Sequence, residues 1–453
     1  MHHKKPYLKA SLRLSASALK HGGDVCTVEE ALVDRSAYIV DEQNNTTAYA
    51  LARYGKVLQV TFFPAPPPSV SFLTTFCTLN GAPTELISEP ALVTTEGNLA
   101  LFLMKHGWYR YKHDYYVYRA PGAAGGVLLM LEEVRHPEKQ GLFLSSDSYY
   151  FHDQEVGLLR HKSRDDLDAY KIAALRTDDE DPRMSRCNLY MYDSQSKTWD
   201  RKTGVLADQR YKNQLATHHC SRVITIGGDA GTMGWVDLKQ GIALCDVLGG
   251  KEDSLTSRLV RYIPLPDGGP VKKRNILRDT RRRFRTVAAV HGRIQYVEVQ
   301  IHVRPGPRPK RLHGTYFPAG WTVVRWSTTA GKTRWRKDCQ LSSSDITVPA
   351  DMAALLPTLP RDIDEDATTL DRLHVGHPTI SLGDDSDIVY FQAKMDEVEK
   401  DAWVIAVNTK KKVLQGVTEF APRCVYSMDF TYMPTTISKY LTPACTKTCN
   451  KDK

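Results

Sequence analysis

The sequence predicts an all-β protein, β-propeller-like with about six blades, and three observations favour this class. Apolar and polar residues alternate with period two in many short segments. Gly, Pro, Asp or Asn bound most of these segments, as expected of strands that end in turns. One pattern of strand, polar turn and strand also recurs along the chain. Numerous strands need a sandwich, a barrel or a radial array to remove their open edges, and the recurrence favours the radial array.

Eight segments rich in Val, Ile, Tyr and Phe show the strand pattern most clearly. They are residues 56–63, 114–120, 188–194, 221–227, 293–303, 321–327, 387–393 and 402–408. Helical signals are few. Thr27 and Glu30 have capping-box spacing, so residues 27–36 predict one short helix. Residues 349–360 predict a second helix, which its prolines keep short.

The recurring pattern is clearest in residues 188–202, 322–338 and 403–417. Each has an apolar strand, a polar turn, and a Trp or another hydrophobic residue that opens the returning strand. We expect Asp193 or Asn408 to accept hydrogen bonds from the backbone of its own turn. The returning tryptophans should cover sheet junctions, and the pattern therefore predicts burial of Trp199, Trp235, Trp335 and Trp403.

The stretch GWVDLKQGIALCDVL, residues 234–248, fits the same scheme and predicts a β-hairpin. Because side chains alternate along a strand, Val236 and Leu238 should share one face while Trp235 and Asp237 share the other.

Within this hairpin, a structural motif is expected. Asp237 should accept hydrogen bonds in a turn that Gly241 closes, and Cys245 should be a small buried hydrophobic residue. The alternative is that Asp237 or Asp246 is an acid/base residue or a metal ligand at the mouth of a channel.

Several motifs in chain order resemble those of a known family. They are residues 60–76, 114–120, 155–160, 189–199, 234–248, 261–266 and 377–391. Their succession is similar to the plant domain of unknown function 1618 family, abundant in grasses, over roughly residues 38–435. The resemblance implies an uncharacterised protein similar to the kelch-like propeller domains that follow F-boxes, and it brings no catalytic motif.

These patterns suggest three parts of the chain. Residues 1–37 are expected to be a basic, partly disordered N-terminal extension with the first short helix. Residues 38–435 are expected to be a single propeller-like domain, and residues 436–453 a basic tail.

Charge is unevenly distributed. Residues 272–338 hold 18 Lys and Arg against 3 Asp and Glu, whereas residues 345–401 hold 14 acids against 4 bases. Such segments either lie side by side and partly neutralise each other, or form two faces with different partners.

The basic segment begins with KKRNILRDTRRRFR, residues 272–285. This run is compatible with a solvated loop, a bipartite nuclear-import signal, or phosphate contacts to nucleic acid. The candidate residues are Lys272, Lys273, Arg274, Arg281, Arg282, Arg283 and Arg285.

Four other motifs contain residues that could form a binding or catalytic site, but each is better explained as ordinary structure. THHC at 217–220 places adjacent histidines on opposite faces of a strand. GGDAGTMG at 227–234 and GDDSDI at 383–388 predict turns, because they lack the spacing of a phosphate loop or an EF-hand. CTKTC at 445–449 predicts free thiols. No catalytic signature is found, so we assign no catalytic residue, cofactor or metal.

The function expected from these observations is a non-enzymatic protein-interaction scaffold or adaptor whose partners are other proteins. One alternative is a nuclear, nucleic-acid- or chromatin-associated protein that uses residues 272–338; another is a propeller enzyme with a dispersed site. Nine scattered cysteines indicate reduced thiols and a cytoplasmic or nuclear location. No apolar run is long enough for a membrane span. Residues 1–23, which lack acids, are also compatible with an organelle transit peptide.

Overall fold

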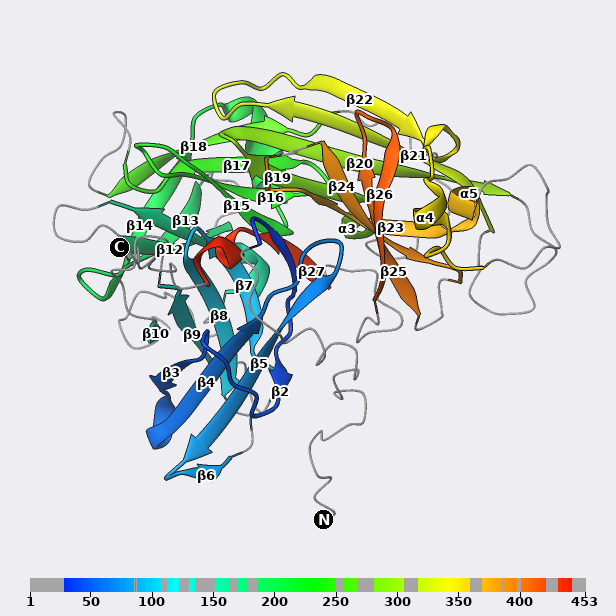
Figure 1. Ribbon diagram of the computed structural model, residues 1–453. Coiled ribbons are helices and arrows are strands. Elements are labelled where there is room, and N and C mark those ends of the chain that lie inside the picture. The colour runs from blue at the N-terminus through cyan, green and yellow to red at the C-terminus, as the bar shows by residue number, and fades with distance from the viewer. Residues whose placement is uncertain are drawn as a thin grey trace, which may run out of the picture. The chain divides into compact units, whose positions relative to one another are not determined.

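The computed structural model describes most of the chain and confirms an all-β protein (Figure 1). The residues described are 28–84, 86, 88–106, 112–121, 130–134, 151–162, 169–177, 186–249, 256–266, 281–304, 317–358, 369–384, 387–396, 401–420 and 431–441. The chain divides into two compact units. Unit 1 comprises Met1–Pro66, Val70–His136 and Thr435–Lys453, and unit 2 comprises Pro67–Ser69 and Pro137–Pro434. The predicted domain boundaries at residues 38 and 435 stay predictions.

Unit 1 contains two sheets. The strands of the first are β1 (Ala31–Asp34), β2 (Tyr38–Ile39), β3 (Ala48–Leu51), β4 (Lys56–Phe63), β5 (Val70–Leu79) and β6 (Ala82–Pro83). The second is an antiparallel meander of β7 (Ala91–Glu96), β8 (Leu99–His106), β9 (Lys112–Arg119) and β10 (Met130–Val134). Aromatic rings join the two sheets, since Phe62 of β4 lies 4.7 Å from Tyr118 of β9 between ring centroids.

The helix predicted for residues 27–36 is wrong in the described part of this segment. Ala31–Asp34 form β1, and all four residues are buried. Leu32 is paired in parallel with Val70 of β5. An isolated helix of this length is marginal, so burial of a continuous apolar run within the sheet outweighs the capping pattern.

Unit 2 contains four antiparallel meanders that follow one another along the chain. The first has β11 (Val156–His161), β12 (Ala169–Thr177), β13 (Arg186–Asp193) and β14 (Thr198–Leu206), and the second β15 (Arg222–Gly227), β16 (Thr232–Asp237), β17 (Gly241–Asp246) and β18 (Ser257–Pro264). The third has β19 (Arg285–Val290), β20 (Arg293–Arg304), β21 (Phe317–Thr328) and β22 (Arg336–Ser342), and the fourth β23 (His374–Ile380), β24 (Ile388–Lys394), β25 (Ala402–Asn408) and β26 (Val413–Phe420).

The first strands of these meanders are neighbours in order: β11 contacts β15, β15 contacts β19, and β19 contacts β23. Sequential four-stranded meanders with adjacent first strands are the arrangement of propeller blades. Unit 2 is therefore propeller-like. The first two meanders also share hydrogen bonds, because β14 pairs in parallel with β18.

The remaining described elements are short. The helices are η2 (Arg53–Gly55), η4 (Asp153–Glu155), η5 (Gln209–Tyr211), α2 (Lys212–Ala216), α3 (Arg281–Phe284), η6 (Ser343–Asp345), α4 (Ala350–Ala353), α5 (Thr369–Arg372) and η7 (Ile437–Tyr440), and β27 (Tyr432–Thr435) spans the boundary of the units. The short helix predicted from residue 349 is confirmed as α4. No helix among the described residues is long and apolar enough to cross a bilayer.

Hydrophobic cores lie between successive meanders of unit 2. Trp235 of β16 joins a cluster with the first meander, whereas Val236 and Leu238 join a cluster with the third. The predicted alternation of these side chains is confirmed, and both faces of this strand are buried, as in a central blade.

All eight predicted strand segments are strands. Of the four tryptophans, Trp199, Trp235 and Trp403 are buried. Trp335 is only half-buried; its Nε1 donates to the carbonyl oxygen of Pro264 at 2.7 Å, at a junction between the second and third meanders. Cys77, Cys187, Cys220, Cys245 and Cys339 are free thiols, and the other four cysteines lie outside the described residues.

Candidate functional site

The hairpin predicted for residues 234–248 is formed by β16 and β17. At its turn Asp237 is buried, and its carboxylate accepts hydrogen bonds from Lys239 N at 2.7 Å and His219 N at 3.0 Å. Gln240 Nε2 donates to the same group at 3.3 Å. Asp237 is thus a turn residue that also fixes the neighbouring THHC segment.

The other residues of this motif also serve to hold the fold together. Cys245 is fully buried in the core between the first two meanders. Asp246 accepts from Thr232 Oγ1 at 2.6 Å and Arg261 Nη2 at 2.7 Å. A Cβ atom on Gly241 would lie 2.5 Å from the carbonyl oxygen of Ile263, so this glycine permits close approach of β18.

A pocket of 540 Å³ lies beside this turn. Its lining comes from η4, the end of β12, α2 with the segment that follows it, and the β16–β17 turn. The lining residues are His152, Gln154, Glu155, Leu175, Arg176, Thr177, Leu215, Ala216, His218, His219, Cys220, Ser221, Asp237, Leu238 and Lys239. The volume lies in the range of small-molecule sites. The structure thus brings together THHC and the hairpin, which the sequence presents as separate motifs.

His218 has the most unusual surroundings in this pocket. Both ring nitrogens are shielded from solvent, and neither has a hydrogen-bond partner within normal geometry, although the backbone of Trp235 lies close enough to favour the protonated ring. The edge of the ring faces Tyr262, with 6.0 Å between centroids. Burial lowers the pKa of His218 to about 4, so the imidazole is neutral at physiological pH.

Cys220 is not placed as a nucleophile. Its Sγ donates to the carbonyl oxygens of Gln154 at 3.1 Å and Arg222 at 3.3 Å. Burial raises the pKa of this thiol strongly, whereas a nucleophilic cysteine needs a lowered pKa. No group of three His, Cys, Asp or Glu in the described chain is arranged to hold a metal ion.

A second candidate site is an exposed apolar surface in unit 1. Tyr49 and Leu51 of β3 are 52% and 70% exposed, Tyr54 of η2 is 82% exposed, and Val57 of β4 is 37% exposed. Leu51 and Val57 are cross-strand partners. These four residues are called the apolar strip below. The alternation in AYAL at 48–51 could have indicated two exposed apolar side chains in the sequence.

The turn that presents Tyr54 is anchored by a buried carboxylate. Arg53 forms an ion pair with Asp114 of β9, with Arg53 Nη2 at 2.6 Å from Asp114 Oδ1. Asp114 is fully buried, and its hydrogen bond raises the pKa of Arg53. Tyr54 itself has a φ of 62°, an uncommon value outside glycine. The exposed tyrosine is therefore held by a fixed turn.

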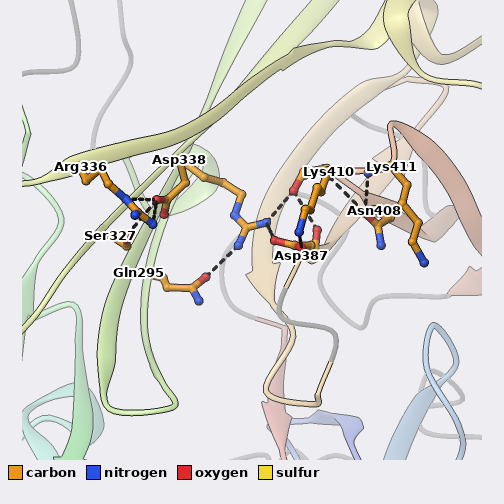
Figure 2. A network of polar contacts seen from close by, with 10 residues as sticks. Gln295, Ser327, Arg336, Asp338, Asp387, Asn408, Lys410 and Lys411 are labelled. Carbon is orange, nitrogen blue, oxygen red and sulfur yellow. Dashed lines mark hydrogen bonds and ion pairs between the residues drawn. The ribbon is translucent and has the colours of Figure 1, made fainter.

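The oppositely charged segments meet between the third and fourth meanders (Figure 2). Buried Arg325 of β21 donates to Asp387 Oδ1 at 3.1 Å, and also to Thr409 Oγ1 and Gln295 Oε1. Lys410 Nζ lies 3.8 Å from Asp387. Here the basic and acidic segments lie side by side, the first of the two arrangements expected from the sequence.

Figure 2 also shows Asp338 of β22, which bridges to β21, and Asn408, which organises a turn. Asp338 accepts from Ser327 and Arg336. Asn408 Oδ1 accepts from the backbone N–H of Lys410 and Lys411, as its place in the repeat predicts. Asp193 similarly accepts from Gln195 N.

The nuclear-import and phosphate-contact candidates fall into two groups. Lys272, Lys273 and Arg274 lie outside the described residues, and Arg281, Arg282 and Arg283 are in α3. Arg283 lies over the ring of Phe284. Arg285 donates to Glu298 Oε1 at 2.9 Å and to the carbonyl oxygen of Leu238, so its guanidinium is committed to internal contacts.

The other motifs are turns where they are described. Residues 228–231 connect β15 to β16, and the described part of residues 381–387 connects β23 to β24. Residues 445–449 lie outside the described chain.

The fold and these sites define an all-β, propeller-like protein with a polar pocket and an exposed apolar strip. Residues 235–390, which begin within the hairpin, match the family described as Protein of unknown function (DUF1618). This match confirms, for that segment, the resemblance predicted from the sequence. Plant origin and kelch-like similarity stay predictions.

Several solved structures have a distant likeness to the chain, each at 10% sequence identity. A prolyl endopeptidase matches with a TM-score of 0.30 over 74% of this chain and 43% of its own, so the chain spans less than half of that protein. The β-propeller domain of the Trilobed protease from Pyrococcus furiosus matches with a TM-score of 0.28 over 72% and 93%. The dihydro-heme d1 dehydrogenase NirN matches with a TM-score of 0.30 over 91% and 70%. No curated protein matches the sequence.

Proposed function

We propose that the protein is a non-enzymatic scaffold that binds another protein through the apolar strip. This proposal rests on the exposure of four apolar side chains, which lie on adjacent strands and on the turn between them. Contiguous apolar surface is more often an interaction site than a neutral part of a monomer's surface, and Tyr is among the residues enriched at interfaces.

The fixed turn supports this function further. A side chain that is already ordered loses less conformational entropy on binding. The ion pair of Arg53 with Asp114 orders the backbone that carries Tyr54. The positive φ of Tyr54 is an unfavourable conformation that the surrounding contacts maintain.

The pocket in unit 2 does not favour the enzymatic alternative. Asp237 is bonded to backbone donors, and Cys220 donates to backbone carbonyls. A nucleophile and its base would instead contact each other. The side chains of Arg285 and Arg325, which belong to the basic segment, are committed to internal ion pairs and do not support the nucleic-acid alternative.

The test compares partners captured by the full chain and by two charge-introducing variants in cells that express the protein. Leu51→Asp/Tyr54→Asp should lose at least one partner that the unaltered chain retains, because a carboxylate cannot be desolvated without a counter-ion. Leu355→Asp is the matched control, since Leu355 is 52% exposed but lies outside the strip.

Direct binding of the captured partner, measured with purified proteins, should be at least tenfold weaker for the strip variant and unchanged for the control. Equal capture and equal affinity for all three proteins would contradict the proposal. Size-exclusion chromatography with light scattering identifies the case in which the partner is a second copy of the chain.

A further inference from the structure

The loop between β21 and β22, residues 329–335, carries two exposed cations on a fixed backbone. Lys332 and Arg334 are both exposed. Thr328 Oγ1 donates to the carbonyl oxygen of Arg334 at 2.9 Å, and the bonded indole N–H of Trp335 anchors the end of the loop. Hydrogen bonds therefore set the backbone positions of both cations.

A second group of exposed cations lies on the turn between β25 and β26. Lys411 and Lys412 are exposed, and so is Lys410 before them. Asn408 Oδ1 accepts from the backbone N–H groups of Lys410 and Lys411 at 3.2 and 2.9 Å. This turn is therefore fixed as well.

The loop and the turn belong to neighbouring meanders and lie at adjoining ends of them. Arg325, near the end of β21, donates to Asp387 Oδ1 and Thr409 Oγ1, which lie directly before β24 and directly after β25. Figure 2 shows Arg336 and Lys411 on either side of this junction. The exposed cations therefore form one surface. The residues called the cationic face below are Lys332, Arg334, Lys411 and Lys412.

The four cations of this face have no carboxylate partner among the residues that the structure describes, unlike the cations next to them. Arg336 is paired with Asp338 at 2.8 Å, and Lys410 Nζ lies 3.8 Å from Asp387. Like charges gathered on one surface repel one another. A bound anionic group would relieve this repulsion.

We infer that the cationic face binds an acidic segment of a partner protein, rich in Asp and Glu. Lys and Arg side chains donate charge-assisted hydrogen bonds to carboxylates, and complementary charge speeds association and helps to select the partner. This face lies in unit 2, whereas the apolar strip lies in unit 1. The inference goes beyond the proposed function, and either can fail without the other.

Two features favour an acidic peptide over a nucleic acid. Trp335 is the one aromatic residue of the described loop and turn, and it is half-buried with its N–H bonded internally. Unpaired bases therefore find no exposed ring on which to stack. Asp338 and Asp387 also lie among the cations, and a continuous row of phosphates would meet their negative charge, whereas a peptide can space its carboxylates to avoid them.

Binding is tested by fluorescence anisotropy of the full chain with two labelled probes of equal negative charge. One is a peptide of alternating Glu and Ser, and the other is a single-stranded oligonucleotide of mixed sequence. At about 50 mM sodium chloride, where surface charges are weakly screened, the peptide should bind, and more tightly than the oligonucleotide.

Two double variants each remove the charges of one turn. They are Lys332→Gln/Arg334→Gln and Lys411→Gln/Lys412→Gln. Each should weaken peptide binding several-fold, and their combination should weaken it by about tenfold or more. The melting temperature should not change, because these side chains form no ion pair within the described fold.

The matched control is Lys162→Gln/Arg186→Gln, which removes the same charge from two exposed positions of unit 2 outside the face. It should bind the peptide as tightly as the unaltered chain. The inference is overturned if the peptide does not bind with a Kd below about 1 mM, if only one of the two turn variants binds less tightly, or if the control loses as much affinity as they do. Tighter binding of the oligonucleotide would overturn it in favour of a nucleic-acid surface.

Discussion

Two buried aspartates organise the two candidate sites by different means. Asp114 in unit 1 is neutralised by a cation, Arg53, which is 61 residues away in the sequence. Asp237 in unit 2 is stabilised mainly by backbone N–H groups, one of them only two residues away. The first arrangement holds a turn that exposes apolar side chains, and the second holds a turn that borders a polar pocket.

The comparison shows that a buried carboxylate can be stabilised by a full counter-charge or by peptide dipoles, with different consequences when it is disturbed. Removing the counter-charge of a buried ion is among the costliest changes in a protein. Removing a carboxylate that accepts from backbone N–H groups leaves only these neutral donors without an acceptor. The first and third of the following predictions test this difference, and the second tests the burial of two neutral histidines.

The largest effect is expected from Arg53→Met, which removes the counter-charge of the buried Asp114 carboxylate. We expect the stability of unit 1 to fall by about 3–5 kcal/mol, measured by hydrogen exchange of backbone amides in β4 and β9. The double variant Arg53→Met/Asp114→Leu should recover most of this loss. A single variant as stable as the unaltered chain would mean that the ion pair does not anchor the Tyr54 turn.

The second-largest effect is expected in the pH dependence of the stability of unit 2. Burial lowers the pKa of His218, and of His374 in β23, to about 4 from an ordinary 6.5. Each histidine binds a proton in the unfolded chain before it does in the fold, so stability should fall as pH decreases from about 6.5 to 4.

For each histidine the slope should reach about 1.4 kcal/mol per pH unit, measured by urea unfolding at a series of pH values. His218→Phe should remove one of the two contributions and His374→Phe the other. Unchanged slopes in both variants would contradict the burial of these rings. The Arg53 guanidinium should add nothing in this window, because its pKa is raised above an already high value.

The smallest effect is expected from Asp237→Ala, which leaves the N–H groups of Lys239 and His219 without their acceptor. The free energy of unfolding should decrease by about 1–3 kcal/mol, measured by urea unfolding, and Asp237→Asn should cost less because its carbonyl oxygen can still accept. Equal losses of stability in Asp237→Ala and Asp237→Asn would contradict the role of this side-chain oxygen as the acceptor of the turn.

The same contrast explains what the sequence could predict. Turn carboxylates and amides such as Asp193, Asp237 and Asn408 bond to N–H groups two or three residues away, so a local pattern reveals them. Strand alternation is also local, which is why Trp235 and Val236 were assigned to opposite faces correctly.

Contacts between distant segments were not accessible in this way. Nothing near Arg53 in the sequence indicates Asp114, and nothing near His218 indicates Arg176 or His152. The capping-box spacing of Thr27 and Glu30 predicted a helix wrongly for the same reason, because it is a local pattern. The pairing of β1 with the distant β5 overrides that weak local preference. Gly241 was identified as special, but its reason is the close approach of β18 and not a positive φ.

The parallel pairing of β14 with β18 makes the first two meanders of unit 2 one continuous eight-stranded sheet. A blade joined to its neighbour only by side chains can open alone, whereas this pair shares a backbone ladder. Opening β18 breaks hydrogen bonds that β14 also needs, so the strands β11 to β18 should exchange their amide protons as a single cooperative unit. The pocket and its hairpin are built on this unit, and local fluctuations of one blade are therefore coupled to those of the other.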